Sequence, residues 1–385
     1  MYVSLLYGTE QSGGGPMKLG YVSATDVVDP TGGASRTAKM WFDNLIERGF
    51  DVHVVCLGED ETTLTVDGIR VHTVTPPRPY ETIRSHLEAI DPDVVLTQNV
   101  WSDLALDAAD ELDIPSVFSV VSAIGDEEHL RSFSPTKFVA NSRYTQQWIA
   151  DQWGRDSTLV YPTIDFDFYD LETDRNVSRT HGEYITIINP ASRKGGEIFH
   201  SVADSLPERS FCAKVGWYGL RDESYNFSLE SQAPIAQTFF GGIDVAPEQA
   251  ISEPSFDDLD NVDYITEKKI REVYADTRLL VVPSQWRETF GRVVLEAMYN
   301  RIPVVSSHRG ALPEACDGAG LLVEDWSNPD EWREKIERMD DPSVYETFAS
   351  RGKQRAERFR SRQDEQYDRL ADVLRRAADD FPADS

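Results

Sequence analysis

The chain has 385 residues, 40% of them hydrophobic, which predicts two domains that each bury a core. Its formal net charge of −29 disfavours nucleic acid and anionic lipid as partners, because such a surface repels both. No stretch approaches the ~20 continuous apolar residues of a membrane span, and three distant cysteines (Cys56, Cys212 and Cys316) indicate free buried thiols in a reducing cytoplasm instead of a disulfide framework or a zinc site.

The first part of the chain predicts an extension followed by an α/β domain. Residues 1–16 have no periodic pattern, so we expect a disordered N-terminal extension and a native start at Met17. They also lack the basic region and long apolar core of a signal peptide, and we expect a cytoplasmic protein. Expected strands over 17–165 are Leu19–Val22, Val52–Cys56, Val71–Val74, Val94–Thr97, Ser116–Val121, Lys137–Val139 and Leu159–Tyr161.

Helical stretches separate these strands. Between the first two, residues 36–48 carry apolar side chains at helical spacing, and Gly49 suits a C-cap. Strands that alternate with helices of this length predict βαβ units around a parallel sheet.

A second series of strands predicts a second domain over 184–350. A polar stretch without periodicity, 166–183, predicts the interdomain linker before it. The expected strands are Tyr184–Ile188, Phe211–Val215, Leu279–Val282, Val304–Ser306 and Leu321–Val323. Residues 216–262 are aperiodic and predict a long loop, and 351–379 read as a charged amphipathic helix.

The acidic residues are spread along the whole chain, and arginine outnumbers lysine. This spread favours adaptation to a salt-rich interior, where repulsion between surface charges is screened within ~3 Å at 1 M salt. We therefore predict a halophilic source, with an ordinary acidic cytosolic enzyme as the alternative.

The segment Pro283–Glu296 holds the most informative pattern. Glu288 lies at an expected strand-to-helix turn, and Glu296 lies two helical turns further on. Between them, Gly291 marks a helix start, where unpaired N–H groups and the helix dipole favour an anion. A diphosphate bound there would have a carboxylate near each of its ends, each suited to hydroxyl groups. The pattern therefore predicts a nucleotide sugar as ligand.

The same spacing, Glu-x7-Glu with Phe-Gly after the first glutamate, resembles the donor-site signature of glycosyltransferase family 4. Further matching segments are Thr31–Ala34, Asn189–Gly195 and the Gly-x-x-Pro-Glu turn Gly310–Glu314. The resemblance implies the GT-B fold, with two doubly wound Rossmann-like domains that face each other across a cleft. In such enzymes the C-terminal helix often crosses back to the first domain, and 351–379 is placed to do so; a solvated cap on the second domain is the alternative.

The resemblance also implies roles for residues of the motif. It assigns Glu288 to hydroxyls of the transferred sugar and Glu296 to the nucleotide ribose. The apolar neighbours of Glu296 agree with this, since a buried carboxylate needs a partner; an exposed helical glutamate is the alternative. Backbone N–H groups of four residues would bind the diphosphate: Phe290, Gly291, Arg292 and Val293. The Arg292 side chain either takes part or faces solvent.

Lys194 is the candidate cation for the charge that builds on the leaving diphosphate, with Arg193 beside it. Both follow a strand, at the sheet edge where α/β folds bind ligands. Many members of the family carry an arginine where this chain has Asn189, so either Arg193 substitutes or one cation fewer is used. A solvated loop is the alternative for both. Gly32 and Gly33 would approach the phosphate from the first domain, although a Gly-Gly pair alone also suits a simple tight turn.

The resemblance implies a retaining hexosyltransferase that needs neither a metal nor a cofactor. Its partners are a nucleoside-diphosphate sugar and a hydroxyl acceptor of unknown type; a membrane contact is at most peripheral, because the chain shows no polybasic or strongly amphipathic segment. No acceptor-side residue can be assigned after the strand Ser116–Val121. Two alternatives stay open: a GT-B nucleotide-sugar epimerase, and a non-catalytic partner in polysaccharide assembly. A nicotinamide dehydrogenase is disfavoured, since no Gly-x-Gly-x-x-Gly follows the first strand.

Overall fold

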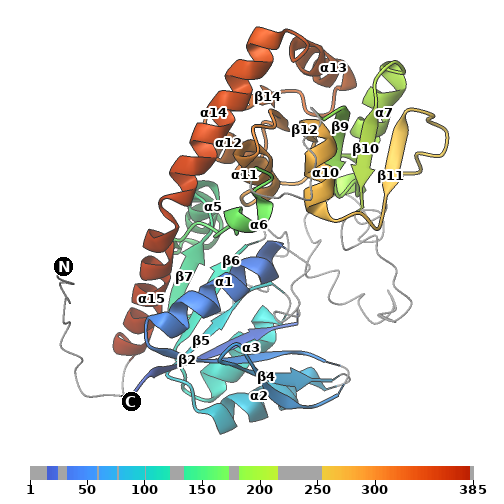
Figure 1. The fold of residues 1–385 in the computed structure, drawn as a ribbon. Coiled ribbons are helices and arrows are strands. Elements are labelled where there is room, and N and C mark those ends of the chain that lie inside the picture. Colours follow the sequence, from blue (N-terminus) through green and yellow to red (C-terminus); the bar gives the residue numbers. More distant parts are fainter. Residues whose placement is uncertain are drawn as a thin grey trace, which may run out of the picture.

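The computed structural model describes residues 15–24, 33–58, 60–75, 78–99, 101–121, 134–172, 182–215 and 254–381. These residues form two α/β domains, one above the other in Figure 1, each built on a mainly parallel sheet. This architecture confirms the predicted fold class. The expected extension 1–16 lies almost wholly outside the described residues, as does most of the long loop expected at 216–262.

The N-terminal domain contains an eight-stranded sheet in the order β3-β4-β2-β1-β5-β6-β7-β8. Its strands are β1 Met17–Ser23, β2 Phe50–Leu57, β3 Thr63–Val66, β4 Ile69–Val74, β5 Val94–Thr97, β6 Ser116–Val120, β7 Lys137–Ala140 and β8 Thr158–Leu159. Its helices are α1 Gly33–Glu47, α2 Pro79–Ile90, α3 Ser102–Glu111 and α5 Arg143–Trp153. Only β3, which pairs antiparallel with β4, departs from the parallel arrangement among the described strands.

Both faces of this sheet are covered, because alternate residues of each central strand enter different cores. In β1, Leu19 and Tyr21 pack with α1, whereas Val22 packs with α2 and α3. Strands β2 and β5 alternate in the same way. This burial on both faces explains why the strands read as nearly continuous apolar runs in the sequence.

The C-terminal domain contains a six-stranded sheet in the order β11-β10-β9-β12-β13-β14. Its strands are β9 Tyr184–Ile188, β10 Phe211–Lys214, β11 Val262–Ile265, β12 Thr277–Val282, β13 Val304–Ser307 and β14 Leu321–Val323. Its helical elements are the 3-10 turn η1 Ser192–Lys194, α7 Gly196–Ser205, α10 Ile270–Asp276, α11 Arg292–Tyr299, α12 Leu312–Cys316, α13 Pro329–Arg338 and α14 Pro342–Arg360. Alternate residues of β12 again enter opposite cores, one with α11 and α12 and the other with α7 and α13.

The end of the chain forms two helices where the sequence predicts one. Helix α14 ends at Arg360 and lies on the C-terminal domain, and α15, Gln363–Asp379, lies on the N-terminal domain (Figure 1). Leu370 and Leu374 of α15 are fully buried in the core beneath α1. The passage between domains therefore falls at 361–362, about ten residues beyond the expected start of the crossing helix at 351.

The start of the predicted linker belongs to the C-terminal domain. A short helix, α6 Phe166–Tyr169, buries Phe166 and Tyr169 against α11, and Leu171 joins the same core. The helix has four residues, so it shows no apolar repeat by which the sequence could reveal it. Residues 173–181 of the expected linker lie outside the described part of the chain.

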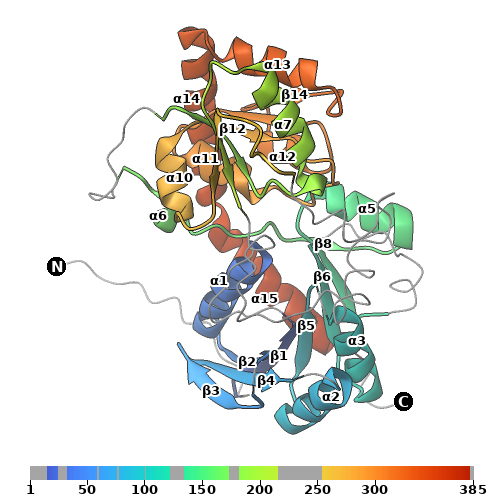
Figure 2. The ribbon, with the colours of Figure 1, turned by 90° about the vertical axis from the view of Figure 1, so that its right-hand side faces the viewer.

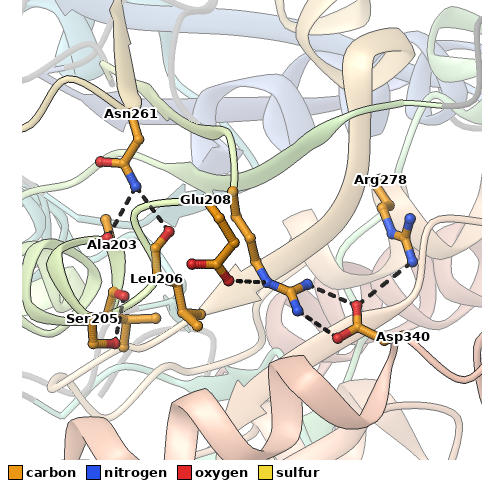
Figure 3. A network of polar contacts seen from close by, with 9 residues as sticks. Ala203, Ser205, Leu206, Glu208, Asn261, Arg278 and Asp340 are labelled. Carbon is orange, nitrogen blue, oxygen red and sulfur yellow. Dashed lines mark hydrogen bonds and ion pairs between the residues drawn. The ribbon is translucent and has the colours of Figure 1, made fainter.

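Polar contacts fix the edge of the second sheet that carries β10 and β11 (Figure 3). The amide of Asn261 donates to the carbonyls of Ala203 and Leu206 at 3.0 and 3.1 Å, which joins the end of α7 to the start of β11. Arg209 binds both carboxylate oxygens of Asp340, and this bidentate pair ties β10 to the end of α13.

Candidate active site

The candidate site lies where the loop after β12 meets the N-terminal domain (Figure 2). Gly291 is the N-cap of α11 and adopts a left-handed φ of 90°. No side chain in the described part of the chain caps this helix start. Its first N–H groups are thus the unpaired donors that the sequence predicts for an anion site.

Glu288 and Lys194, both predicted to contact the nucleotide sugar, form an ion pair with each other. The Glu288 side chain is 13% exposed and that of Lys194 is 26% exposed. The Ser284 hydroxyl donates to the same Glu288 oxygen at 3.0 Å. The pair therefore brings the predicted sugar-binding carboxylate and the predicted cation to one point.

Two glycines let three loops meet at this pair. A Cβ on Gly195 would lie 2.0 Å from the Pro283 carbonyl oxygen, and a Cβ on Gly310 would lie 2.3 Å from that of Glu288. Both glycines also have positive φ angles. The close approach allows the Ala311 N–H to donate to the Glu288 carbonyl at 2.7 Å. The Gly310–Glu314 turn thus supports the backbone of Glu288.

Arg193 takes a different position from Lys194. Its side chain is buried, and its guanidinium lies 5.6 Å from the centre of the Trp286 ring. Its backbone carbonyl accepts from the N–H groups of Gln285 and Trp286. Asn189 has a left-handed φ of 62°, and its side-chain oxygen has no hydrogen-bond partner among the described residues. Whether Arg193 substitutes for an arginine at 189 stays a prediction.

Glu296 is buried and already has protein partners. The Tyr274 hydroxyl donates to one of its oxygens at 2.9 Å, and Arg292 Nε lies 3.5 Å from the other. Burial is the main cause that raises the pKa of Tyr274, and the Glu296 charge raises it further. This phenol therefore stays a hydrogen-bond donor. Tyr274 and Arg292 therefore offset part of the cost of burying the Glu296 carboxylate, a cost that the sequence pattern assigns to ribose hydroxyls alone.

The Arg292 side chain joins the two domains. Its guanidinium donates to the carbonyls of Gly33 at 3.1 Å and Thr163 at 2.8 Å, and to the Thr37 hydroxyl. The alternative that this side chain faces solvent is therefore wrong, since it is only 12% exposed. Gly33 lies against the Arg292 side chain. Its approach to a phosphate stays a prediction, and Gly32 lies outside the described residues.

Phe290 and Val293 of the motif contribute side chains to the core. Phe290 is buried, with ring centres 5.9 Å from Tyr161 and 5.4 Å from Phe359. Val293 is partly buried against the same core. Their side chains hold the loop in place, and their predicted contribution to a diphosphate rests on the backbone.

Sequence reasoning missed Thr289 and Glu314 as interdomain contacts. The Thr289 hydroxyl donates to the Val121 carbonyl at 2.6 Å and accepts from the Asn141 amide at 2.9 Å. The Glu314 carboxylate accepts from two N–H groups at the start of α5, and from the Tyr161 hydroxyl at 2.5 Å. An acidic residue such as Glu314 can be expected to bind the N–H groups at a helix start. Only the tertiary structure shows that the helix it caps is α5.

The segment after β6, 122–133, for which the sequence gives no acceptor-side assignment, lies outside the described residues. Within the described ranges, no cluster of three or more His, Cys, Asp or Glu side chains could hold a metal ion. In the same ranges, no helix is both long and apolar enough to cross a bilayer.

Models of known protein families match both domains of the chain. The model of Glycosyltransferase Family 4 matches residues 31–168, and the model of Glycosyl transferases group 1 matches residues 257–355. The second range contains the loop after β12 and the whole of α11. Together the two models match more than half of the chain.

Solved structures show the same fold. Sucrose-phosphate synthase from Thermosynechococcus elongatus has a TM-score of 0.71 at 14% identity, over 94% of this chain and 98% of that one. Anabaena HepE, solved in complex with UDP-glucose, has a TM-score of 0.67 at 16% identity, over 93% of this chain and 100% of that one.

Sequence relatives match over shorter segments. The D-inositol 3-phosphate glycosyltransferase of Corynebacterium jeikeium is 41% identical over 69 residues, which cover 17% of this chain and 16% of that protein. The chain aligns with less than a quarter of the length of the curated relatives that it matches. With the Glycosyltransferase Family 4 model on the first domain and the Glycosyl transferases group 1 model on the second, the chain is a glycosyltransferase of the family 4 type.

Proposed function

We propose that this chain is a retaining, metal-independent hexosyltransferase that moves a sugar from a nucleoside-diphosphate sugar to a hydroxyl acceptor. The observation that carries the proposal is the Lys194–Glu288 pair beside the uncapped start of α11, with Glu296 further along the same helix. The cation and the helix start suit a diphosphate, and the two carboxylates suit hydroxyl groups on either side of it.

The pair also suggests how the donor enters. A diphosphate offers Lys194 a more highly charged partner than Glu288. Once Lys194 moves to the phosphate, the Glu288 carboxylate is left to accept hydrogen bonds from sugar hydroxyls. The complex of HepE with UDP-glucose supports a nucleotide sugar as the class of donor.

In the proposed reaction the bond between the anomeric carbon and the diphosphate oxygen breaks. A bond from the same carbon to the acceptor oxygen forms on the same face of the sugar. The acceptor proton passes to the departing phosphate oxygen. Lys194 and the first N–H groups of α11 would stabilise the charge that develops on the leaving diphosphate.

The test is transfer from radiolabelled nucleotide sugars to acceptors in a cell extract. We expect Glu288→Gln and Lys194→Ala each to reduce transfer by at least ~10²-fold, the scale seen when one positioned electrostatic group is lost. Lys353→Ala, on α14, serves as the matched control and should leave transfer unchanged. Near-normal turnover by both site variants would contradict the site assignment.

The same assay separates the alternative functions. Release of an epimerised donor without any acceptor would indicate a GT-B epimerase. Binding of donor with no turnover in any extract would indicate a non-catalytic partner. A thermal-shift screen of donors identifies the sugar and the base, because a bound ligand stabilises the folded chain by mass action.

A further inference from the structure

A hollow of about 390 Å³ lies between the two domains, next to the candidate site but distinct from it. One wall is α5 of the N-terminal domain, with Tyr144 and Trp148. The other wall belongs to the C-terminal domain and includes Arg287, Arg309 and Trp326. Arg287 immediately precedes Glu288, whose side chain pairs with Lys194, and neither Glu288 nor Lys194 lines the hollow.

The two arginines of the hollow have no acidic partner in the part of the chain that the structure describes. Arg309 lies over the Trp326 ring, with its guanidinium 4.1 Å from the ring centre, and its buried Nε has no hydrogen-bond partner there. Burial is the main cause that lowers the pKa of Arg309, and the charge of Arg287 lowers it further. Two like charges thus face each other in a chain with 67 acidic and 38 basic residues, where carboxylates are abundant.

Two carboxylates at the hollow have partners other than its arginines. Asp151, which also lines it, accepts from the Gln147 amide at 2.8 Å. Glu324 lies 2.5 Å from the ring nitrogen of His308, another lining residue. An anion that entered the hollow would meet two guanidinium groups that pair with no carboxylate among the described residues, and it would also meet the Asp151 carboxylate, whose charge opposes it.

The other lining side chains indicate what the anion is attached to. Trp148, Trp326 and Tyr144 are aromatic, and such side chains offer apolar contact to the C–H face of a sugar ring. Guanidinium groups bind carboxylate, sulfate and phosphate with paired hydrogen bonds. Aromatic side chains beside a few charged and amide groups are typical of a small-molecule site.

We propose that this hollow binds an acidic sugar of the acceptor, a glycan residue that carries a carboxylate, sulfate or phosphate group. This inference rests on the proposed function, because it describes the acceptor of the same reaction. The donor is assigned to Lys194 and the start of α11, which lie outside the hollow. The hollow includes α5 from the opposite domain, and Gly310, which lines it, packs against the backbone of Glu288. A sugar held there would therefore lie on the other side of this backbone from the Lys194–Glu288 pair.

Sodium glucuronate is the probe, with glucose as the neutral sugar, and binding to the full chain is measured by saturation-transfer difference NMR. We expect glucuronate to bind at least about tenfold more tightly than glucose, since charge-assisted hydrogen bonds are the strong ones. Arg287→Gln and Arg309→Gln should each weaken glucuronate binding by about tenfold or more. Arg351→Gln is the matched control, because Arg351 also lies over a ring, that of Phe348, outside the hollow.

Three results would overturn the assignment. One is equal binding of glucuronate and glucose, and another is undiminished binding by both hollow variants. The third is loss of glucuronate binding in Lys194→Ala, which would place the probe in the donor site. Inorganic sulfate that bound as tightly as glucuronate would reduce the hollow to a site for bare anions and contradict a sugar ligand.

A parallel thermal-shift measurement with nucleotide sugars separates this inference from the proposed function. A wild-type chain that bound no nucleotide sugar would contradict the proposed function. A chain that bound a nucleotide sugar but not glucuronate would contradict only the acidic acceptor. Circular dichroism of Arg309→Gln, with Arg309→Lys as the variant that keeps the charge, distinguishes lost recognition from lost folding.

Discussion

The Arg292 side chain connects Glu296, in the C-terminal domain, to residues of the N-terminal domain. Its Nε faces Glu296, and its terminal nitrogen contacts Gly33, Thr37 and Thr163 of the first domain. Arg292, the first residue of α11, thus also joins the two domains, and we call its contacts with Gly33, Thr37 and Thr163 the latch. Movement of either domain would change the position of the carboxylate that we assign to the ribose.

The latch predicts an energetic coupling between Arg292 and Thr37. We expect Arg292→Gln and Thr37→Val each to raise the KM for the donor, and the double variant to add little to either. Residues in contact typically show non-additive effects of about 0.5–3 kcal/mol. Additive effects in a double-mutant cycle on kcat/KM would contradict the latch.

A histidine cluster at the edge of the first sheet predicts a dependence of stability on pH. Burial lowers the pKa of His53 and His86, and it lowers that of His72 to about 4. The folded state therefore holds these imidazoles neutral, whereas the unfolded chain protonates near pH 6.5. Since the unfolded state then binds more protons, stability should fall as the pH drops from about 6.5 towards 4, and the cluster should add no slope above that range.

The check is a series of thermal melts between pH 4 and 8. His72→Gln should flatten the fall below pH 6.5. The Arg209–Asp340 pair, in which the Arg209 hydrogen bonds lower the pKa of Asp340, adds a loss of stability only at more acidic pH. An unchanged slope between pH 6.5 and 5 in the variant would contradict the role of the cluster.

At the scale of elements, α15 completes the N-terminal domain. Its apolar face packs into the core with α1, and Arg48 pairs with Asp368 at 2.8 Å at the edge. The side-chain oxygens of Gln363 and Gln366 accept from the N–H groups of Ile164 and Tyr161, respectively. The first turn of α15 therefore also binds the backbone of the segment 161–164, which leads into the C-terminal domain. The last helix is therefore a structural part of the first domain.

This packing predicts that α15 contributes to the stability of the first domain. Leu370→Ala should lower the free energy of unfolding by about 2–5 kcal/mol, because it leaves a cavity in a fully buried site. Arg376→Ala removes an exposed pair with Asp372 on the same helix and should change stability by less than about 0.5 kcal/mol. Urea denaturation gives the difference, and amide exchange in β1 locates it. Equal effects of the two changes would contradict the role of the buried face.

The strands that the sequence missed share one property. In β3 and β11, both at sheet edges, no residue is fully buried. An edge strand with exposed side chains lacks the apolar run that marks the central strands, so pattern reading passes over it. The central strands were predicted because burial on both faces selects Val, Ile and Leu.

For the candidate site, the residues of the local motif could be predicted from the sequence, whereas their contacts with the other domain could not. Local spacing places Glu288, Lys194 and the start of α11, because each follows a strand at the same sheet edge. The contacts of Arg292, Thr289 and Glu314 depend on a domain more than a hundred residues away in sequence. No local pattern encodes them.

At the scale of the whole molecule, the charge predicts a dependence on salt. With a net charge of −29, self-repulsion opposes the compact state at low ionic strength, and screening relieves it. We expect a higher urea midpoint in molar KCl than in dilute buffer. Equal stability in both would contradict adaptation to a salt-rich interior and favour an ordinary acidic enzyme.

The return of α15 to the first domain has a consequence for biosynthesis. The ribosome makes the strands of the N-terminal domain before the C-terminal domain, yet the helix that covers one face of their sheet follows the whole C-terminal domain in the chain. The C-terminal domain, apart from the chain that leads into it, is contiguous and can close before translation ends. The N-terminal domain is therefore completed only after the C-terminal domain has been made, and its uncovered apolar face is the surface that a chaperone would need to shield in a nascent chain.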